Sequence, residues 1–185
     1  MPKAKEASRK KGKVVLSVAR ISRQKRLDVL ICAFHAACAE FPDWELRIVG
    51  PVYDQGYFDE LKRLVTRLGL IGRVHFVGPV SEDELEAEYD RASIFALTSD
   101  WEGSSIARVE AMAHGLPLLT SEAGCGSQYA SLGSVVVPVG DVEAASAGLK
   151  KLMGDAKLRE EIARAQLAAV LTWDQVAARI EKLLA

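Results

Sequence analysis

The chain has 185 residues, of which 49% are hydrophobic and 26% are charged, the balance of a protein that buries a core. Roughly 70% of the unfolded surface can be buried at this length, so the fold needs no metal or disulfide for stability. The 24 basic and 25 acidic side chains nearly cancel, which argues against nucleic acid or an acidic membrane as the main partner. No stretch approaches the ~18 apolar residues of a membrane span, and the N-terminus lacks the apolar segment of a secretory signal.

The three cysteines, Cys32, Cys38 and Cys125, are widely spaced and form no C-x-x-C pair. They therefore indicate neither a disulfide framework nor a zinc site. Unpaired thiols are typical of a reducing compartment, so we expect a cytoplasmic protein.

Residues 1–13 differ from the rest of the chain in composition. They hold six basic side chains against one acidic side chain, Glu6, and almost no large apolar residue. Such a segment cannot bury enough apolar surface to fold by itself. We predict a disordered basic arm or interdomain linker over 1–13, in preference to a nucleic-acid-binding tail, and one folded domain over 14–185.

From Val14 onward, short apolar runs alternate with amphipathic segments of helical period. The apolar runs predict strands at 14–18, 44–49, 74–77, 94–97, 116–120 and 134–137. The periodic segments predict helices at 27–41, 58–68, about 104–114, 142–153, 157–171 and 173–184, and one that begins after Ser81. This last helix has a capping box, because Glu84 follows Ser81 at the third position.

This alternation predicts an α/β fold, a Rossmann-like doubly wound parallel sheet of about six strands with helices on both faces. Ligands of such sheets bind beyond the carboxyl ends of the strands. The candidate functional residues are therefore those that directly follow the strands, at 20–26, 50–56, 78–81, 99–105, 121–126 and 138–142.

The segment after the first strand carries four basic side chains, Arg20, Arg23, Lys25 and Arg26. Arginine forks combined with the point charge of a lysine suit the binding of a diphosphate. A solvated basic turn is the alternative that the residues leave open.

The segment after the fourth strand places Glu102 and Gly103 before a helix that begins near Ser104 and Ser105. Gly103 lets a ligand approach the backbone, and the N–H groups at a helix start favour an anion, although Ser104 alone also fits an ordinary N-cap. Glu110 has apolar neighbours, so we expect it to lie buried near the sheet, where a carboxylate needs partners. Glu102 and Glu110 would lie ~12 Å apart along a helix. That separation suits two ends of an elongated hydroxyl-bearing ligand and is too long for the carboxylate pair of a glycoside hydrolase.

Other catalytic signatures are weak or missing in the sequence. Gly124-Cys125-Gly126 begins a dinucleotide-like pattern, but Tyr129 occupies the position of the third glycine, so we reject this interpretation. There is no Walker A motif and no D-x-D motif, and no metal site is expected. The histidines do not cluster and are interpreted as structural or surface residues: His35, His75 and His114.

Three local patterns occur in a recognisable order. The first is Arg20-x4-Lys25. The second is the pair Glu102-Gly103 followed by Glu110, which continues into Ala111-Met112-Ala113-His114-Gly115-Leu116-Pro117. The third is the Gly-rich loop at Gly124. Together they resemble the C-terminal, donor-binding domain of GT-B glycosyltransferases, in particular the retaining family 4, also called group 1. The resemblance covers about residues 14–184, so the expected fold is one half of a GT-B enzyme.

The resemblance implies three catalytic residues. Arg20 and Lys25 would neutralise the diphosphate leaving group, and Glu102 would hold the donor sugar. It also implies donor-binding residues, which are Gly103, Ser104 and Ser105 for the β-phosphate and sugar, Glu110 for the ribose, and Gly50, Val77 and Gly78 for the base. The implied reaction moves a glycosyl group, of the hexosyl type, from a nucleotide-diphosphate sugar with retention at the anomeric carbon, without a metal or cofactor.

Four positions depart from the family pattern. Ser104-Ser105 stand in place of Phe-Gly, Arg26 stands in place of a glycine after Lys25, and Gln128 stands in place of a glutamate. Arg108 occupies a helical position that is normally apolar, and we interpret it as an extra cation or a surface residue. None of the four removes a charge that the diphosphate needs.

GT-B enzymes have two such domains, and the acceptor is bound mainly by the N-terminal one. The resemblance therefore implies a partner, either an acceptor-binding N-terminal domain or a separate subunit, and predicts that this half alone binds donor but turns over little. Nothing in this half indicates contact with a membrane. The alternatives are a non-catalytic nucleotide-sugar-binding or scaffolding subunit and, less favoured by the residues around Glu102, a fragment of a GT-B phosphorylase.

Overall fold

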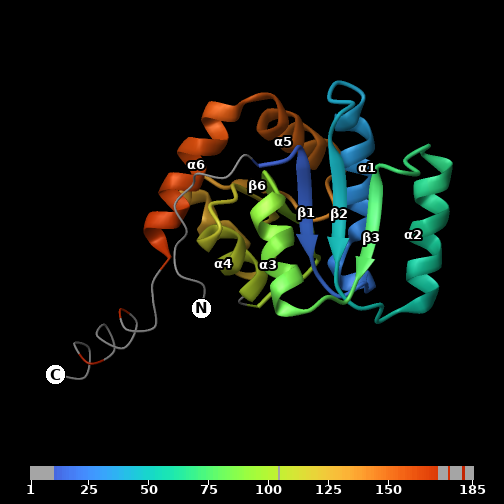
Figure 1. Ribbon diagram of the computed structural model, residues 1–185, viewed down its shortest axis with the longest axis horizontal. Coiled ribbons are helices and arrows are strands. Elements are labelled where there is room, and N and C mark those ends of the chain that lie inside the picture. Colours follow the sequence, from blue (N-terminus) through green and yellow to red (C-terminus); the bar gives the residue numbers. More distant parts are fainter. Residues whose placement is uncertain (1–10, 104, 171–174, 176–180, 182–185) are drawn as a thin grey trace.

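The apolar runs of the sequence form a parallel sheet in the computed structural model, which describes residues 11–103, 105–170, 175 and 181. Within these residues the sheet has six strands in the order β3-β2-β1-β4-β5-β6 (Figure 1). The strands are β1 (Val14–Val18), β2 (Glu45–Val49), β3 (Val74–Gly78), β4 (Ile94–Leu97), β5 (Leu118–Ser121) and β6 (Val135–Val137). The helices are α1 (Leu27–Cys38), α2 (Gln55–Arg67), α3 (Glu82–Arg91), α4 (Ile106–Ala113), α5 (Val142–Gly154) and α6 (Ala156–Ala169), with 3-10 helices η1 (Arg23–Lys25) and η2 (Gly124–Leu132).

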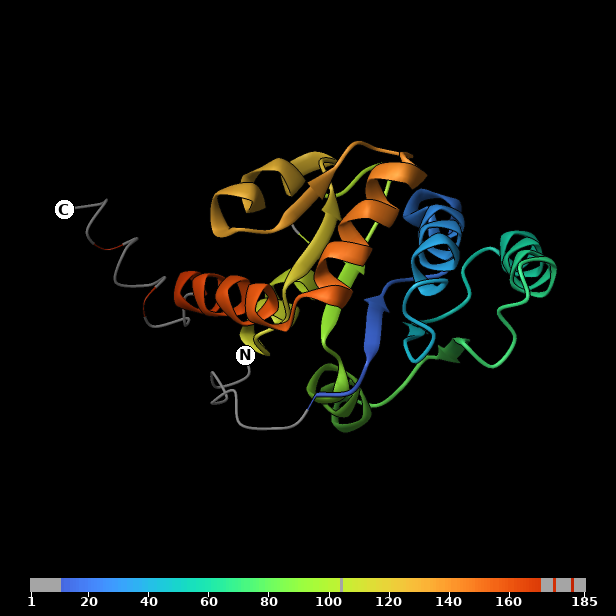
Figure 2. The ribbon, with the colours of Figure 1, turned by 90° about the horizontal axis from the view of Figure 1, so that it is seen from above.

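Helices cover both faces of the sheet because successive strand residues point to opposite sides. One core cluster joins Val15 of β1 and Ile48 of β2 to α1, α2 and α5. The other joins Leu16 of β1 and Phe95 of β4 to α3 and α4. The two layers are visible in Figures 1 and 2, and the predicted doubly wound α/β fold is confirmed.

The strand order reverses between β1 and β4, which are hydrogen-bonded neighbours. The chain proceeds outward from β1 to β2 and β3, and then returns to add β4 on the other side of β1. In doubly wound sheets this point of reversal is where ligands bind, beyond the carboxyl ends of the two strands. The loops after β1 and β4 are therefore the first place to look for function.

Several predicted boundaries differ from the structure by one to three residues. The helix predicted over 27–41 ends at Cys38, and the helix predicted over 58–68 begins at Gln55. The fifth strand begins at Leu118 instead of residue 116, because Pro117 has no N–H to donate to the ladder and contributes only its carbonyl, to Phe95. The segment after β5 was predicted as a loop but contains the 3-10 helix η2. Its residues have no periodic apolar pattern that would indicate a helix. The helix predicted over 173–184 lies almost entirely outside the described residues.

The predicted disordered arm is too long at its C-terminal end. Residues 1–10 lie outside the described residues, but residues 11–13 contact the domain. The Gly12 N–H donates to the carbonyl of Arg91, and Lys11 Nζ donates to the carbonyls of His114 and Gly115, at 2.8 and 2.9 Å. These carbonyls end α4, where a cation is favoured. Burial lowers the pKa of Lys11 to about 8.

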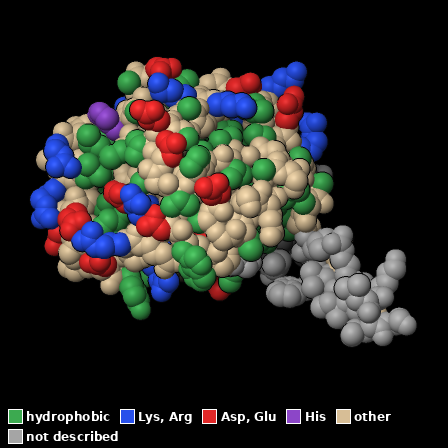
Figure 3. Space-filling model, turned by 180° about the vertical axis from the view of Figure 1, so that it is seen from behind, with side chains coloured by type: hydrophobic (Ala, Val, Ile, Leu, Met, Phe, Trp, Pro, Cys, Tyr) green, Lys and Arg blue, Asp and Glu red, His purple; other side chains and the backbone are tan. Residues whose placement is uncertain are grey.

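The charged side chains on the rear face do not separate by sign (Figure 3). Basic and acidic groups lie intermixed there, around exposed apolar patches. Among the described residues no helix has both the length and the apolar character to cross a bilayer. The same described residues contain no group of three or more His, Cys, Asp and Glu side chains placed to hold a metal ion.

Candidate functional site

The loops after β1 and β4 are joined by several hydrogen bonds across the point where the strand order reverses. The Asp100 N–H donates to the carbonyl of Gln24 at 2.8 Å, and Gln24 Nε2 donates to the carbonyl of Trp101 at 2.7 Å. Arg26 Nη1 lies 2.9 Å from Asp100 Oδ1, and Thr98 Oγ1 donates to the carbonyl of Arg26. Two segments separated by more than 70 residues therefore form one surface at the sheet edge.

Lys25 and Glu102, two of the three predicted catalytic residues, form an ion pair at the centre of this surface. Lys25 Nζ lies 2.5 Å from Glu102 Oε1, and their side chains are 12% and 7% exposed. Ser99 Oγ donates to the same carboxylate oxygen at 2.6 Å. The structure thus brings together a cation and an anion for which the sequence implied separate contacts with a donor.

Arg26, directly after Lys25, explains why glycine is usual at this position. Its φ of +45° lies in the left-handed region, and it is the one non-glycine residue with positive φ that the described chain contains. A side chain there is strained. Arg26 is held in place by ion pairs with Asp28 and Asp100, which offset part of that strain.

Arg20, the third predicted catalytic residue, points away from Lys25. Its side chain is exposed, and its guanidinium carbon lies 4.9 Å from the centre of the Tyr53 ring, in the loop after β2. Lys25 instead faces the loop after β4. The two cations therefore follow the same strand, β1, but contact different neighbouring loops.

The predicted base-lining residues lie together at the ends of β2 and β3. The Gly50 N–H donates to the carbonyl of Gly78 at 2.9 Å, and Val77 is half-buried in the second core cluster. Gly50 has a φ of +142°, and a Cβ on it would lie 2.2 Å from the carbonyl oxygen of Ala19. Only glycine permits this approach of the two loops.

Glu110 is half-buried rather than fully buried, and its carboxylate has a partner that the sequence analysis missed. Tyr89 Oη donates to Glu110 Oε2 at 2.8 Å. The Tyr89 ring is 1% exposed and stacks on His114, with ring centres 5.0 Å apart. Burial raises the pKa of Tyr89, and Glu110 adds to this effect, so the phenol remains a donor. In the sequence, Tyr89 was visible only as an apolar-face residue of its helix.

The start of α4 carries the predicted phosphate-binding backbone. Ser105 is its N-cap and makes no side-chain cap hydrogen bond, while Gly103 is exposed and has open space around its Cα. Ser104 lies outside the described residues, so its predicted role as a backbone donor or N-cap stays a prediction.

The Gly-rich segment packs directly on the loop after β4. A Cβ on Gly124, whose φ is +58°, would lie 1.6 Å from the carbonyl oxygen of Glu102, and one on Gly126 would lie 2.0 Å from that of Ser121. These two glycines therefore allow the Gly-rich segment to pack closely against the backbone at Glu102 and Ser121. Gln128, four residues after Gly124, is exposed.

Arg108 is buried, which rules out the predicted alternative of a surface residue. Its side chain is fully inaccessible, and its guanidinium carbon lies 5.4 Å from the centre of the Tyr129 ring. Among the described residues, none of its three guanidinium nitrogens makes a hydrogen bond of normal geometry, although the adjacent Tyr129 side chain favours the charged form of Arg108. Burial lowers the pKa of Arg108, and the charge of Glu102 opposes this shift.

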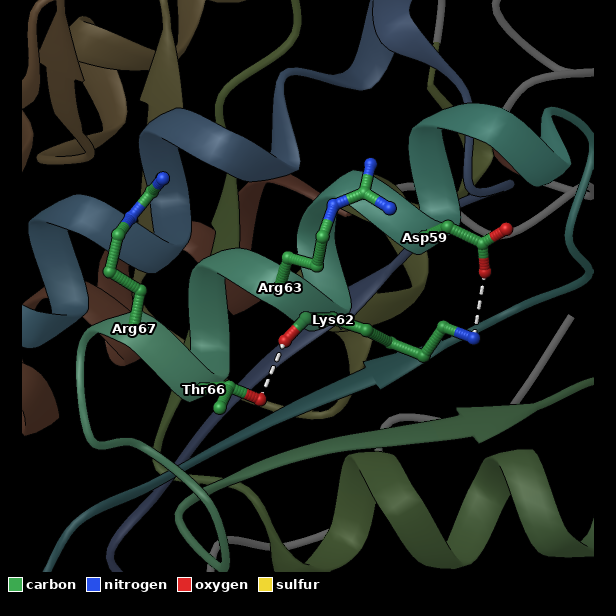
Figure 4. A pocket seen from close by; sticks show the side chains of 5 residues that line it. All are labelled: Asp59, Lys62, Arg63, Thr66 and Arg67. Carbon is green, nitrogen blue, oxygen red and sulfur yellow. Dashed lines mark hydrogen bonds and ion pairs between the residues drawn. The ribbon is translucent and has the colours of Figure 1, made fainter.

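A separate depression lies on the outer side of α2 (Figure 4). It is lined by Asp59, Lys62, Arg63, Thr66 and Arg67. Lys62 pairs with Asp59 at 2.8 Å, and Thr66 donates to the Lys62 carbonyl. All of these side chains come from one helix, whereas the sheet edge combines groups from several loops. We therefore place the functional site at the sheet edge.

Comparison with known proteins agrees with the fold. Residues 2–168 match the protein family described as Glycosyl transferases group 1. The chain belongs to this family. It is 32% identical, over 151 residues, to an exopolysaccharide phosphotransferase of Streptomyces coelicolor, in an alignment that covers 80% of this chain and 16% of that protein.

Solved structures show the same architecture. Anabaena HepE in complex with UDP and glucose superposes with a TM-score of 0.81 at 26% identity, over 94% of this chain and 48% of HepE. The C-terminal domain of a group 1 glycosyl transferase from Francisella tularensis, LpcC, superposes with a TM-score of 0.75 at 22% identity, over 92% of this chain and 87% of that domain. The predicted resemblance to the C-terminal domain of a GT-B glycosyltransferase is confirmed. The chain spans less than half the length of the curated relatives and of HepE.

Proposed function

We propose that this domain binds the nucleotide-sugar donor of a retaining glycosyltransferase. The observation that carries the proposal is the buried Lys25–Glu102 pair, which lies where the strand order reverses and where a parallel sheet binds its ligands. Family membership and the complex of HepE with UDP and glucose support it.

In the proposed complex, positive groups surround the diphosphate. Arg20 and Lys25 approach it from the two sides of β1, and the first N–H groups of α4 face it with the positive end of the helix. Negative charge grows on the diphosphate as the bond to the sugar breaks, so donors already in place lower the barrier. Glu102 and the backbone at Gly103–Ser105 hold the sugar and the β-phosphate.

The remaining donor contacts follow the strand ends outward. Glu110 accepts hydrogen bonds from the ribose, and Gly50, Val77 and Gly78 line the base. We propose that no metal or cofactor takes part, that the acceptor is held by an N-terminal domain or a separate subunit, and that the protein is cytoplasmic. The domain alone then binds donor but turns over slowly, because it does not position the acceptor.

Removing either cation is the direct test of this site. We expect Arg20→Ala and Lys25→Ala each to weaken binding of a nucleoside diphosphate by roughly 1.5–3 kcal/mol, the range for charge-assisted hydrogen bonds. Isothermal titration with UDP, GDP, ADP and dTDP measures the effect and identifies the base. Lys62→Ala on α2 is the control. Unchanged affinity in both site variants would remove the assignment.

The ribose contact is tested by comparing two ligands. Glu110→Gln should weaken binding of the ribonucleoside diphosphate more than binding of its 2′,3′-dideoxy analogue, because only the former offers hydroxyls to the carboxylate. Tyr89→Phe removes the phenol that holds Glu110 and should have the same selectivity, with a smaller loss of about 1 kcal/mol. Titration of both ligands distinguishes this from general destabilisation, in which case both affinities fall equally.

A further inference from the structure

Arg108 is unusual for three reasons, and each raises its free energy in the structure described here. Its side chain is fully buried, and none of its three guanidinium nitrogens makes a hydrogen bond of normal geometry among the described residues. Burying a charge without hydrogen bonds is costly. Arg108 also lies in the first turn of α4, where the helix dipole disfavours a cation.

A second feature of the site needs an explanation as well. Lys25, the cation proposed to hold the diphosphate, is already engaged by Glu102 at 2.5 Å in this structure. If Lys25 moved to a diphosphate, the Glu102 carboxylate would stay buried. Among the described residues its remaining hydrogen bond comes from Ser99, which is uncharged. Losing one member of a buried ion pair costs several kcal/mol, on the order of 3–5. Donor binding would therefore be opposed unless another cation compensated Glu102.

Arg108 and Glu102 border the same short segment of the Gly-rich loop. Both hydrogen bonds that the described residues make to Glu102 use Oε1, and none of these residues is recorded as donating to Oε2. The same short segment contacts both groups, since a Cβ on Gly124 would meet the Glu102 carbonyl and one on Gly126 would lie 3.7 Å from Arg108 Nη2. Glu102 is also the carboxylate whose charge acts on Arg108.

We propose that Arg108 is a positioning residue that takes over Glu102 when Lys25 moves to the donor's diphosphate. In the free protein Lys25 pairs with Glu102, and Arg108 makes no hydrogen bond of normal geometry among the described residues. In the donor complex Lys25 contacts the diphosphate, and Arg108 donates to Glu102. The cluster of two cations and one anion carries one excess positive charge, which Lys25 can then offer to the ligand. This inference rests on the proposed function, because it requires a diphosphate at Lys25.

The test uses charge neutralisation, measured by titration with UDP or GDP, whichever the wild type binds. These ligands carry no sugar, so the proposed sugar contact of Glu102 does not contribute. Arg108→Met should weaken binding about tenfold, in the range of one charge-assisted interaction. In the Arg108→Met background, Glu102→Gln should restore affinity to within about threefold of wild type, because the neutral amide that replaces the carboxylate releases Lys25 and needs no compensating cation.

A second arm measures the coupling directly. Lys25→Met should weaken binding at least about tenfold in the wild-type background but less than about threefold in the Arg108→Met background, because there Lys25 is retained by Glu102. Arg108→Lys keeps the charge and should retain most of the affinity, whereas Arg108→Gln should behave like Arg108→Met. Thermal unfolding serves as the control, since removing a buried charge without partners should not lower the melting temperature.

Each outcome is decisive. Independent effects of Lys25→Met and Arg108→Met, or no rescue by Glu102→Gln, overturn the exchange while leaving donor binding intact. If Arg108→Met does not fold, the affinities of Arg108→Lys and Arg108→Gln for the same ligand test the proposal instead. If the wild type binds none of UDP, GDP, ADP and dTDP, the proposed function fails and this inference fails with it.

Discussion

Gly124→Ala is expected to destabilise the domain by about 3 kcal/mol and to abolish donor binding at ligand concentrations that saturate the wild type. The added Cβ would lie 1.6 Å from the carbonyl oxygen of Glu102, a distance that forces one backbone to move. The φ of +58° adds strain for any L side chain. Because the atom displaced belongs to Glu102, the same change disturbs the Lys25–Glu102 pair.

Gly69→Ala is the control that introduces backbone strain without a steric clash. Gly69 has a similar φ of +68°, but nothing lies within 4 Å of a Cβ built there. Its substitution should cost only about 1 kcal/mol, through the backbone alone. Urea unfolding of the two variants and titration with a nucleoside diphosphate measure the difference. Equal stability and equal binding of the two variants would contradict the packing described for the Gly-rich segment.

Arg47→Met is expected to destabilise the domain by about 2–3 kcal/mol, just below the ~3–5 kcal/mol for breaking a fully buried ion pair. Arg47 Nε and Nη2 each lie 2.6 Å from an oxygen of Glu88, and the two side chains are 17% and 10% exposed. The pair joins β2 to α3, and its loss leaves Glu88 with only the longer 3.5 Å contact to Arg91 among the described residues. Urea unfolding at pH 7 measures the change.

The double variant Arg47→Met/Glu88→Leu provides the control. It removes both charges and should recover most of the stability, because apolar replacements of a buried pair are often neutral. If the double variant is as unstable as the single one, the loss comes from packing rather than from an uncompensated carboxylate.

The same pair predicts how stability depends on pH. Burial disfavours the ionised form of Glu88, yet hydrogen bonds from Arg47 outweigh this effect and hold the pKa of Glu88 below its usual value. The folded state then binds this proton less readily than the unfolded state does. The stabilisation is present above the unfolded pKa of about 4.3 and is lost as the pH falls through the lower folded pKa. Unfolding measured from pH 7 to pH 3 should show a shallower acid loss in Glu88→Gln than in wild type.

Much of the local structure follows from neighbouring residues. The capping box is confirmed, since the Ser81 N–H donates to Glu84 and the Glu84 N–H donates to Ser81 Oγ. β1 and β4 have the predicted bounds, because continuous apolar runs have few alternatives when the sheet is buried on both faces. The 3-10 helix η2 was missed and β5 was predicted to begin two residues too early, because backbone geometry and a proline decide them.

The sequence by itself determined the alternating α/β pattern, the family resemblance and the loops that carry charge, because these depend on residue types and spacings along the chain. Only the tertiary structure decided the pairs: Lys25 with Glu102 and Tyr89 with Glu110, together with the burial of Arg108 against η2. These partners come from segments that the strand order β3-β2-β1-β4-β5-β6 brings together. Their energies depend on burial and on distances of a few ångströms, and both are set by how the helices pack on the sheet.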